Sequence, residues 1–302
     1  MMRKTTKVWL LIAAVLVLAG GMLFACVMSE LNWDFTRLST VKYETKTYEI
    51  SEVFDSITMD TSTADVVFAL SDDGKCKIVC HEEEKAKHSV TVEDGVLTVE
   101  VVDHRTFLDH IGINFGSPRI TVYLPKTEYE TLLIHGATGD VKLSEGFTFR
   151  DISVSLSTGD ICVEGVSAGE LVLSVTTGQV DVSGVSCQGD ICVEVSTGKV
   201  HLADILCKNV ITGTDTGDIS LVDVIAAEKL SISTATGDVR FDSSDAAEVF
   251  VRTDTGDVTG TLLTDKVFLA ETDTGSVDVP KTATGGRCQI VTDTGDIKIT
   301  VE

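Results

Sequence analysis

The sequence predicts an all-β protein, a single-stack parallel β-solenoid of ~20-residue coils, preceded by one N-terminal transmembrane helix. Three observations lead to this prediction. A Thr-Gly dipeptide recurs at intervals of 19 or 20 residues, a β-branched apolar residue stands two positions after every one of its glycines, and an uncharged stretch lies near the N-terminus. A fixed period of this length is typical of repeat architectures. The glycines, which we expect to form structural turns, are Gly139, Gly159, Gly178, Gly198, Gly217, Gly237, Gly256, Gly275 and Gly295.

Each repeat indicates two short strands joined by the Thr-Gly turn. Mostly apolar residues stand two and four positions after the glycine and five and seven before it, and offsets of two place side chains on one face of a strand. Glycine supplies positive φ, and an aspartate that follows it can bond its own backbone. Because one coil cannot bury its own apolar face, we expect successive repeats to stack as successive coils around a continuous core. The aspartates that follow a glycine are Asp140, Asp160, Asp218, Asp238, Asp257 and Asp296.

The N-terminus carries a candidate membrane anchor. Residues 1–7 are basic, and residues 8–28 carry no charge over a length that can span a bilayer. The positive-inside rule then predicts a cytoplasmic stub at 1–7, a transmembrane helix at 8–28 and an extracytoplasmic body. Two alternatives stay open: a cleaved signal peptide, and a lipoprotein modified at Cys26, although Phe24 is bulkier than the usual residue of a lipoprotein cleavage site.

Between the anchor and the regular repeats, the sequence predicts a connector and a cap. Residues 29–42 form a juxtamembrane connector, in which Trp33 and Phe35 suit the membrane interface. Residues 43–131 predict irregular β-rich first coils or a cap, because an open stack exposes strand edges. They include a β-hairpin at 90–102 around Asp94-Gly95 and a solvated loop at 81–85. Residues 132–302 form the regular solenoid.

The body is strongly acidic. The chain has a net charge of −23, and its first 29 residues contribute +3, so the remainder carries −26. Such a body repels nucleic acid and anionic headgroups and attracts cations and basic peptides. The sequence therefore excludes nucleic acid as a partner and favours an unidentified protein or peptide partner of positive charge, although solubility alone also explains the acidity.

Stacked aspartates raise the question of calcium. On adjacent coils they would lie about 4.8 Å apart, where two like charges repel by on the order of 1 kcal/mol even in water. Bound Ca²⁺ would relieve this repulsion, and Asp218, Asp238 and Asp257 are the candidate ligands. The dense Gly-Asp loops of calcium-binding rolls are missing, which favours solvated turn caps instead. Three residues also interrupt the row: Gln179, Lys199 and Ser276.

No stretch predicts catalysis, a cofactor or a transition-metal site. Four repeats contain Asp-Thr-Gly, the tripeptide that pairs two carboxylates in aspartic proteases, but turn chemistry explains all nine repeats and proteolysis only four. These aspartates are Asp215, Asp254, Asp273 and Asp293. The six histidines show no ligand spacing: His81, His88, His104, His110, His135 and His201.

Two cysteines occupy equivalent positions in neighbouring repeats. Cys187 and Cys207 each stand nine residues after a repeat glycine, so a solenoid would stack them within disulfide range. Small buried hydrophobic residues are the favoured role for both.

Three features together resemble the DUF4097 family, whose mostly bacterial members are often labelled putative adhesins. They are the Ser/Asp-Thr-Gly-Asp-Val/Ile repeat, the sequence Thr63-Ala64-Asp65-Val66, and the strand from Arg119 to Pro125. The likeness covers roughly residues 47–302. It implies a surface-exposed bacterial β-solenoid, often held by one membrane span, with some members associated with envelope-stress regulation. It implies no catalytic residues, and fold alone does not establish function.

We therefore expect a membrane-anchored, extracytoplasmic, non-catalytic binding or adhesin-like module. The first alternative is a sensor or regulator of envelope stress that binds cationic peptides. The second, an enzyme on a β-helix scaffold, is disfavoured because the repeat spreads the acidic residues evenly rather than gathering them in a groove.

Overall fold

The computed structural model describes residues 4–34, 39, 41–106, 109 and 116–302. Phe35 and His110 lie outside the described residues. The chain divides into two compact units. The first consists of Met1–Glu44, Glu83–Lys85 and His104–Gly116, and the second of Thr45–Glu82, Ala86–Asp103 and Ser117–Glu302.

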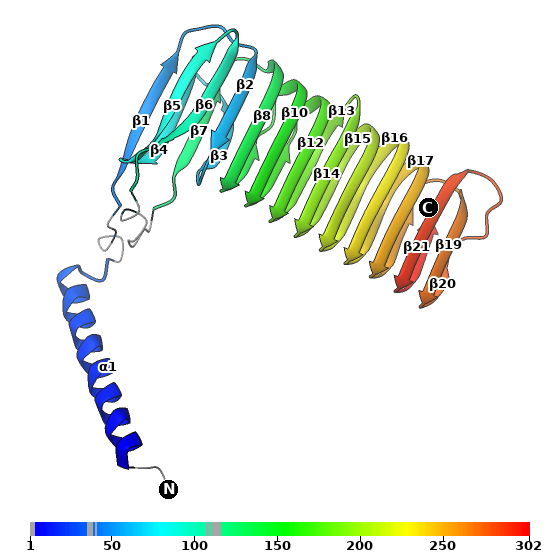
Figure 1. The fold of residues 1–302 in the computed structure, drawn as a ribbon. Helices are drawn as coiled ribbons and strands as arrows, with labels where there is room; N and C mark the ends of the chain where they lie inside the picture. The colour runs from blue at the N-terminus through cyan, green and yellow to red at the C-terminus, as the bar shows by residue number, and fades with distance from the viewer. Residues whose placement is uncertain (1–3, 35–38, 40, 107–108, 110–115) are drawn as a thin grey trace. The chain divides into compact units, whose positions relative to one another are not determined.

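The first unit contains the N-terminal helix α1 (Lys4–Glu30), drawn in blue in Figure 1. Within it, Val8–Glu30 contains an 18-residue window with a mean hydropathy of 2.8 and is long and apolar enough to cross a membrane, a property that signal sequences share. Large apolar side chains along it, such as Leu16 and Val17, are exposed. The predicted apolar helix is confirmed by this span.

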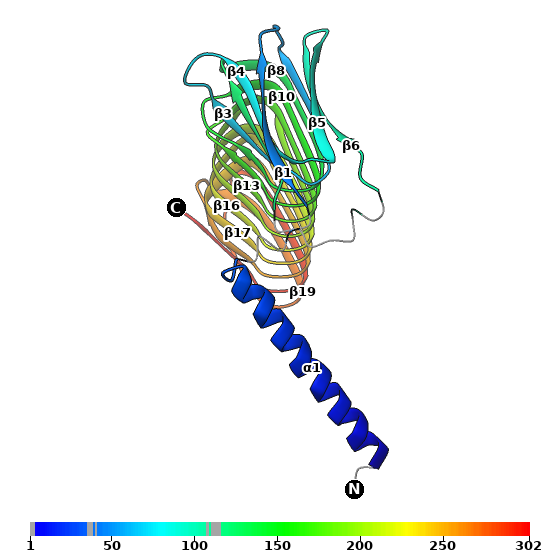
Figure 2. The ribbon, with the colours of Figure 1, turned by 90° about the vertical axis from the view of Figure 1, so that its left-hand side faces the viewer.

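The second unit is a stack of coils whose strands form two long walls of parallel strands (Figure 1). We call the sheet whose strands end at the Thr-Gly turns the first sheet. The sheet whose strands begin just after those turns is the second sheet. Figure 2, seen nearly along the stack, shows the coils lying over one another. The predicted β-solenoid is therefore confirmed.

The first sheet contains, in spatial order, β6 (Val96–Asp103), β2 (Ser56–Thr61), β8 (Glu128–Thr138), β10 (Thr148–Thr158), β12 (Ser167–Thr177), β14 (Asp190–Thr197), the second halves of β15 (Val200–Thr216), β16 (Ile219–Thr236) and β17 (Val239–Thr255), then β21 (Gly286–Thr294) and β19 (Lys266–Thr274). The second sheet contains β7 (Arg119–Leu124), β3 (Asp65–Leu70), β9 (Val141–Leu143), β11 (Ile161–Glu164), β13 (Val180–Cys187), the first halves of β15, β16 and β17, then β18 (Val258–Leu262), β22 (Ile297–Val301) and β20 (Val277–Asp278).

The core lies between the two sheets, and the register explains why it is continuous. Equivalent residues pair from coil to coil, as Leu132, Ile152, Leu171 and Ile191 do in the first sheet. The apolar residue two positions after each repeat glycine is buried in every coil but one. The exception is Val277, which is 44% exposed because no coil covers it.

The last two repeats are not stacked in chain order, so the expectation that successive repeats form successive coils is wrong at this end. β21 lies between β17 and β19, and β22 lies between β18 and β20. The chain passes over one coil position, forms the terminal coil, and returns to fill the gap. The C-terminal strand therefore has a neighbour on each side, and the terminal edges are formed by the nine-residue strand β19 in the first sheet and the two-residue strand β20 in the second.

The N-terminal end has a similar arrangement. The first coil, β2 and β3, lies between β8 and β9 on one side and β6 and β7 on the other. Two antiparallel pairings then close the stack, of β5 (Ala86–Glu93) with β6 and of β4 (Cys76–Glu83) with β7. Strand β1 (Tyr43–Ile50) pairs with β4. Asp94 and Gly95 have φ of +50° and +81°, so the predicted hairpin is confirmed.

The predicted solvated loop at 81–85 is confirmed only for the exposed turn at Glu84 and Lys85 and is wrong for the residues before it. Strand β4 runs on to Glu83, and both Glu82 and Glu83 are buried. Alternation along the strand explains the burial of Glu82, because it continues the inward row that begins with Cys76, Ile78 and Cys80. The charged residues around Glu82 therefore indicated solvent exposure, whereas its carboxylate lies inside the protein.

Candidate functional site

The nine Thr-Gly turns line one edge of the stack, at the tips of the first-sheet arrows in Figure 1. Their glycines have φ between +129° and +154°. At Gly217, a Cβ atom would lie 1.8 Å from the carbonyl oxygen of Gly198 in the neighbouring coil, and in the other eight turns the nearest carbonyl oxygen would lie between 1.7 and 2.4 Å away. Glycine is therefore required both by backbone conformation and by the close approach of successive coils.

The aspartates that follow the glycines form a ladder along this edge. The Oδ1 atom of Asp140 accepts a hydrogen bond of 2.9 Å from the backbone N–H of Asp160, the equivalent residue of the next coil. The same bond joins Asp218 to Asp238 and Asp238 to Asp257. Each carboxylate therefore caps a backbone amide that the turn leaves unpaired within its own coil.

The calcium candidates Asp218, Asp238 and Asp257 are consecutive members of this ladder. The Oδ1 atom of each accepts a hydrogen bond from the backbone N–H of the equivalent residue in the next coil, at 3.2, 2.8 and 2.8 Å. The other carboxylate oxygen of Asp218 lies 3.0 Å from the ammonium of Lys199. The Lys199 ammonium, together with the amide of Asp238, lowers the pKa of Asp218. The carboxylate of Asp218, one of the three that a calcium ion would use, is thus already in contact with the ammonium of Lys199.

The Asp-Thr-Gly aspartates stand on the same edge, two residues before their glycines, and are exposed. Because the last repeat inserts one coil inward, Asp293 lies between Asp254 and Asp273. Over five adjacent coils the two aspartate rows give a continuous band of eight carboxylates, which we call the acidic edge. Its members are Asp215, Asp218, Asp238, Asp254, Asp257, Asp273, Asp293 and Asp296.

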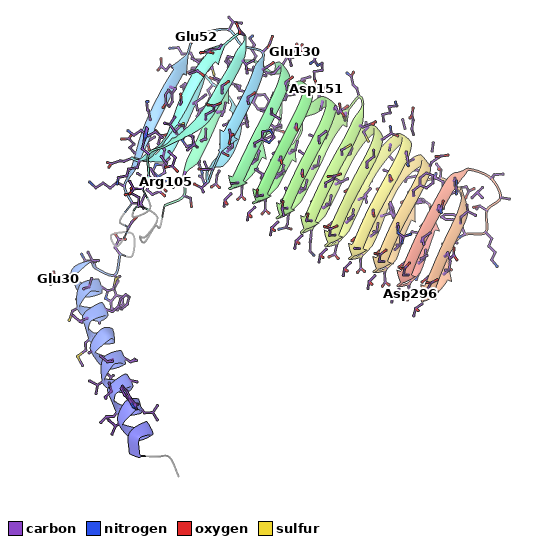
Figure 3. The ribbon with its side chains drawn as sticks, viewed as in Figure 1. Glu30, Glu52, Arg105, Glu130, Asp151 and Asp296 are labelled. Carbon is purple, nitrogen blue, oxygen red and sulfur yellow. The ribbon has the colours of Figure 1, made fainter. Side chains whose placement is uncertain are left out.

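The acidic edge is concentrated toward the C-terminal end of the stack, where Figure 3 labels Asp296. Asp296 accepts hydrogen bonds from the backbone N–H and hydroxyl of Ser276 at 2.7 and 2.9 Å, which lower its pKa. Arg252 contacts Asp254 at 3.4 Å, but both side chains remain more than half exposed. The edge is therefore charged at neutral pH and only partly neutralised, which suits attraction of a cationic partner.

A second acidic region lies at the opposite edge of the first sheet, where Figure 3 labels Glu130 and Asp151. It borders a groove of about 530 Å³ lined by residues that include Asp55, Glu128 and Tyr129. Arg150 lies among these carboxylates and pairs with Glu130 at 2.7 Å and with Asp151 at 2.9 Å. The turn edge is the stronger candidate for a cationic ligand.

The structure brings together one group that sequence spacing missed. Cys80, Glu82 and His88 are buried in strands β4 and β5, which together with β1 we call the N-terminal cap, and each offers a metal-ligand atom within 4.8 Å of the other two. Among the described residues, this is the one group of three or more cysteine, histidine, aspartate or glutamate side chains with that geometry. Part of this group could have been found from the sequence, because residues two apart in a strand share a face and Cys80 and Glu82 are two apart in β4.

The two stacked cysteines are buried free thiols. Cys187 and Cys207 follow paired residues of β13 and β15, and neither forms a disulfide. Burial raises the pKa of Cys207 to about 12. These residues therefore pack as small apolar side chains in this structure.

Comparison with known proteins gives a family and several distant neighbours. The model of the family described as Toastrack DUF4097 matches residues 54–189 and 188–302. A crystal structure named as a putative adhesin from Bacteroides fragilis is 15% identical, with a TM-score of 0.45 over 86% of this chain and 97% of that one. One named as a putative lipid binding protein from Parabacteroides distasonis is 13% identical, with a TM-score of 0.42 over 87% and 98%. No curated protein matches the chain in sequence.

Proposed function

The chain belongs to the Toastrack DUF4097 family, and from this premise we propose that it is a single-pass membrane protein whose extracytoplasmic solenoid binds a cationic partner without catalysis. Residues 8–28 anchor it, with the N-terminus inside the cell. The solenoid acts as an adhesin-like module that presents the acidic edge. The observation that carries the proposal is the stacking of eight aspartates on five adjacent coils of one edge.

Charge and rigidity both support this role. A stack whose coils share a core and a backbone ladder holds its carboxylates in a fixed row, so a flexible basic segment can meet several of them without first ordering the protein. An exposed ion pair contributes only about 0.2–1 kcal/mol, so binding requires many such contacts at once. A repeated edge supplies them at strand spacing, about 4.8 Å.

The test is binding of an oligolysine peptide to the full chain in detergent micelles, followed by fluorescence anisotropy at low and high salt. The variant Asp254→Asn/Asp273→Asn/Asp293→Asn removes three negative charges from the acidic edge. None of these three side chains accepts a hydrogen bond in the aspartate ladder. At about 0.5 kcal/mol per lost pair, affinity should fall roughly tenfold. High salt should weaken binding to the unaltered chain as well.

A matched control removes the same charge elsewhere. Asp181, Asp242 and Asp278 are exposed on the outer side of the second sheet and are changed to asparagine together. This control should bind the peptide nearly as well as the unaltered chain. Equal loss in both triple variants would mean that overall charge matters and not the acidic edge, and salt-independent affinity would refute the proposal.

The anchor is tested separately by membrane fractionation and protease treatment of intact cells. A tag placed after Glu302 should be cleaved from outside, while the Cys26→Ala variant should stay with the membrane. The intact mass of the purified chain separates the alternatives, because a lipoprotein would begin at an acylated Cys26 whereas a spanning helix would retain residues 8–25.

A further inference from the structure

The N-terminal cap contains a fully enclosed group of three side chains with different ligand chemistries. Cys80 and Glu82 point inward from β4, and His88 is the third residue of β5, the next strand along the chain. Cys80 and Glu82 are 0% exposed and His88 is 5% exposed. A sulfur, a carboxylate oxygen and an imidazole nitrogen lie within 4.8 Å of one another.

Polar contacts within the group are incomplete. The Oε2 atom of Glu82 accepts a hydrogen bond of 2.6 Å from the backbone N–H of His88 and lies 2.8 Å from its Nδ1 atom. The other oxygen of Glu82, Oε1, and the Nε2 atom of His88 are buried with no hydrogen-bond partner among the described residues. Nearly all buried polar atoms in proteins have partners, so the unpartnered Oε1 atom of this fully buried carboxylate indicates a missing ligand.

We propose that Cys80, Glu82 and His88 bind a single Zn²⁺ ion that fastens β4 to β5 and stiffens the N-terminal cap of the solenoid. Sulfur, nitrogen and oxygen together suit a borderline-soft ion such as Zn²⁺, whereas Ca²⁺ and Mg²⁺ require oxygen ligands. The site is distinct from the acidic edge in position and in ligand chemistry, and it does not depend on the proposed function.

The distances fit a compact coordination sphere. Ligand atoms about 2.0–2.3 Å from a tetrahedral zinc ion stand roughly 3.3–3.8 Å apart. The Glu82 oxygen and the His88 Nδ1 atom are closer than this, and the remaining separations are at most 4.8 Å. For all three atoms to bind one ion, the side chains would rotate and the contact between Oε2 of Glu82 and Nδ1 of His88 would be replaced by bonds to the metal. Binding through both oxygens of Glu82 would supply the four ligand positions of a structural zinc ion.

Charge balance favours occupancy of the site. A thiolate, a carboxylate and a neutral imidazole around Zn²⁺ give a net charge of zero, which is the cheapest state for a group removed from water. Zn²⁺ displaces the thiol proton of Cys80, which leaves to solvent, and takes the Nδ1 position, so that the imidazole proton resides on Nε2. Burial, with the charge of Glu82, raises the pKa of Cys80 to about 12, while Lys46 acts in the opposite direction. Metal must therefore compete with that proton.

The test uses the full chain in detergent, stripped with a chelator and then given Zn²⁺ or Co²⁺ alone. We expect one Zn²⁺ per chain to survive dialysis and to raise the melting temperature. Co²⁺ should produce the thiolate-to-cobalt charge-transfer absorption that requires a bound cysteine sulfur. A chain that retains no stoichiometric zinc, or whose cobalt complex lacks this absorption, would refute the site without any variant.

Variants then identify the ligands. Cys80→Ser and His88→Gln should each weaken Zn²⁺ binding by roughly 100-fold or more, beyond the 10- to 100-fold typical of residues that only orient ligands. The matched control is Cys76→Ser, because Cys76 is buried on the same face of β4, four residues earlier. It should leave zinc affinity unchanged. Circular dichroism of the metal-free variants checks that each still folds.

Two results would assign the metal elsewhere. Unchanged zinc affinity in both Cys80→Ser and His88→Gln would refute the proposal. So would loss of zinc binding in the acidic-edge variant with retention in Cys80→Ser, because the ion would then sit on surface aspartates.

Discussion

The backbone N–H of Asp296 donates a hydrogen bond of 2.8 Å to Oδ1 of Asp257, 39 residues earlier in the chain. Every other Asp-to-Asp rung between regular repeats joins residues 19 or 20 apart. The long rung exists because the last repeat occupies the position that the repeat around Gly275 passed over. The C-terminal strand is thus held between two coils, so the end of the chain does not form the end of the stack.

Replacing Gly295 with alanine should be strongly destabilising. A Cβ atom there would lie 2.0 Å from the carbonyl oxygen of Gly256, and φ is +154°. Strain of about 1–3 kcal/mol from backbone conformation adds to this overlap, so we expect a loss above ~3 kcal/mol. Hydrogen exchange should show the loss in β19 to β22 while the middle coils stay protected, since stability in a stack is local.

The control for that experiment is Gly74→Ala. Gly74 also has positive φ, +71°, but an added Cβ would meet nothing within 4 Å. Gly74→Ala should lower the free energy of unfolding by only about 1–2 kcal/mol, because it adds backbone strain without steric overlap. Equal costs at Gly74 and Gly295 would show that close approach of the coils does not matter.

The hydroxyl of Thr212 provides a prediction of increased stability. It is buried without a hydrogen-bond partner among the described residues, and equivalent positions in neighbouring coils hold Val193 and Ile232. Thr212→Val should therefore stabilise the protein by about 1 kcal/mol, measured as a higher urea midpoint. Thr292→Val is the counterpart, because Thr292 donates to the carbonyl of Gly256 at 3.2 Å. It should destabilise by about 1 kcal/mol, and the same sign for both variants would contradict the assignment.

Substitutions at Asp257 separate a turn cap from a calcium ligand. Asp257→Asn keeps an acceptor for the amide of Asp296 and removes a like charge, so stability should hold or rise slightly at low salt. Asp257→Ala should cost about 1 kcal/mol. Millimolar Ca²⁺ should leave the melting temperature of the unaltered chain unchanged. A large upward shift that Asp257→Asn abolishes would make Asp218, Asp238 and Asp257 calcium ligands after all.

Buried thiols predict a loss of stability at alkaline pH. Burial raises the pKa of Cys207 and of Cys288 from 9.0 to about 12 each. The folded state therefore holds these protons where the unfolded state has released them. The contribution is fully present below pH ~9 and is lost as pH rises toward 12, at up to about 1.4 kcal/mol per pH unit for each thiol. Urea midpoints measured from pH 8 to 11 check the decline, which Cys207→Ala and Cys288→Ala should reduce.

The same pKa values predict low thiol reactivity. At pH 8, only about 10⁻⁴ of the molecules of a thiol with a pKa near 12 are in the thiolate form. Cys207 and Cys288 should therefore resist maleimide until the chain is denatured. Peptide mapping by mass spectrometry gives the readout. Rapid labelling of either residue in the native protein would show that the coils open locally.

What the sequence determined by itself is local and periodic. Thr-Gly turns, two-residue offsets and the apolar N-terminal stretch each follow from short-range geometry. A hairpin repeat was also possible from the sequence, but equal periods with identical turns favoured stacked coils, which bury the shared apolar face. The hairpin at Asp94-Gly95 was predictable for the same reason, since its turn needs positive φ at both residues.

What only the tertiary structure decided is the order of the coils and the neighbours of buried polar groups. A repeat that pairs equally well with any other repeat carries no information about which one it follows, so the insertion of β21 between β17 and β19 is invisible in the spacing. The grouping of Cys80 and Glu82 with His88 depends on how the strands of the cap close over one another. Such contacts lie between residues whose separation in the chain follows no period, and packing alone brings them together.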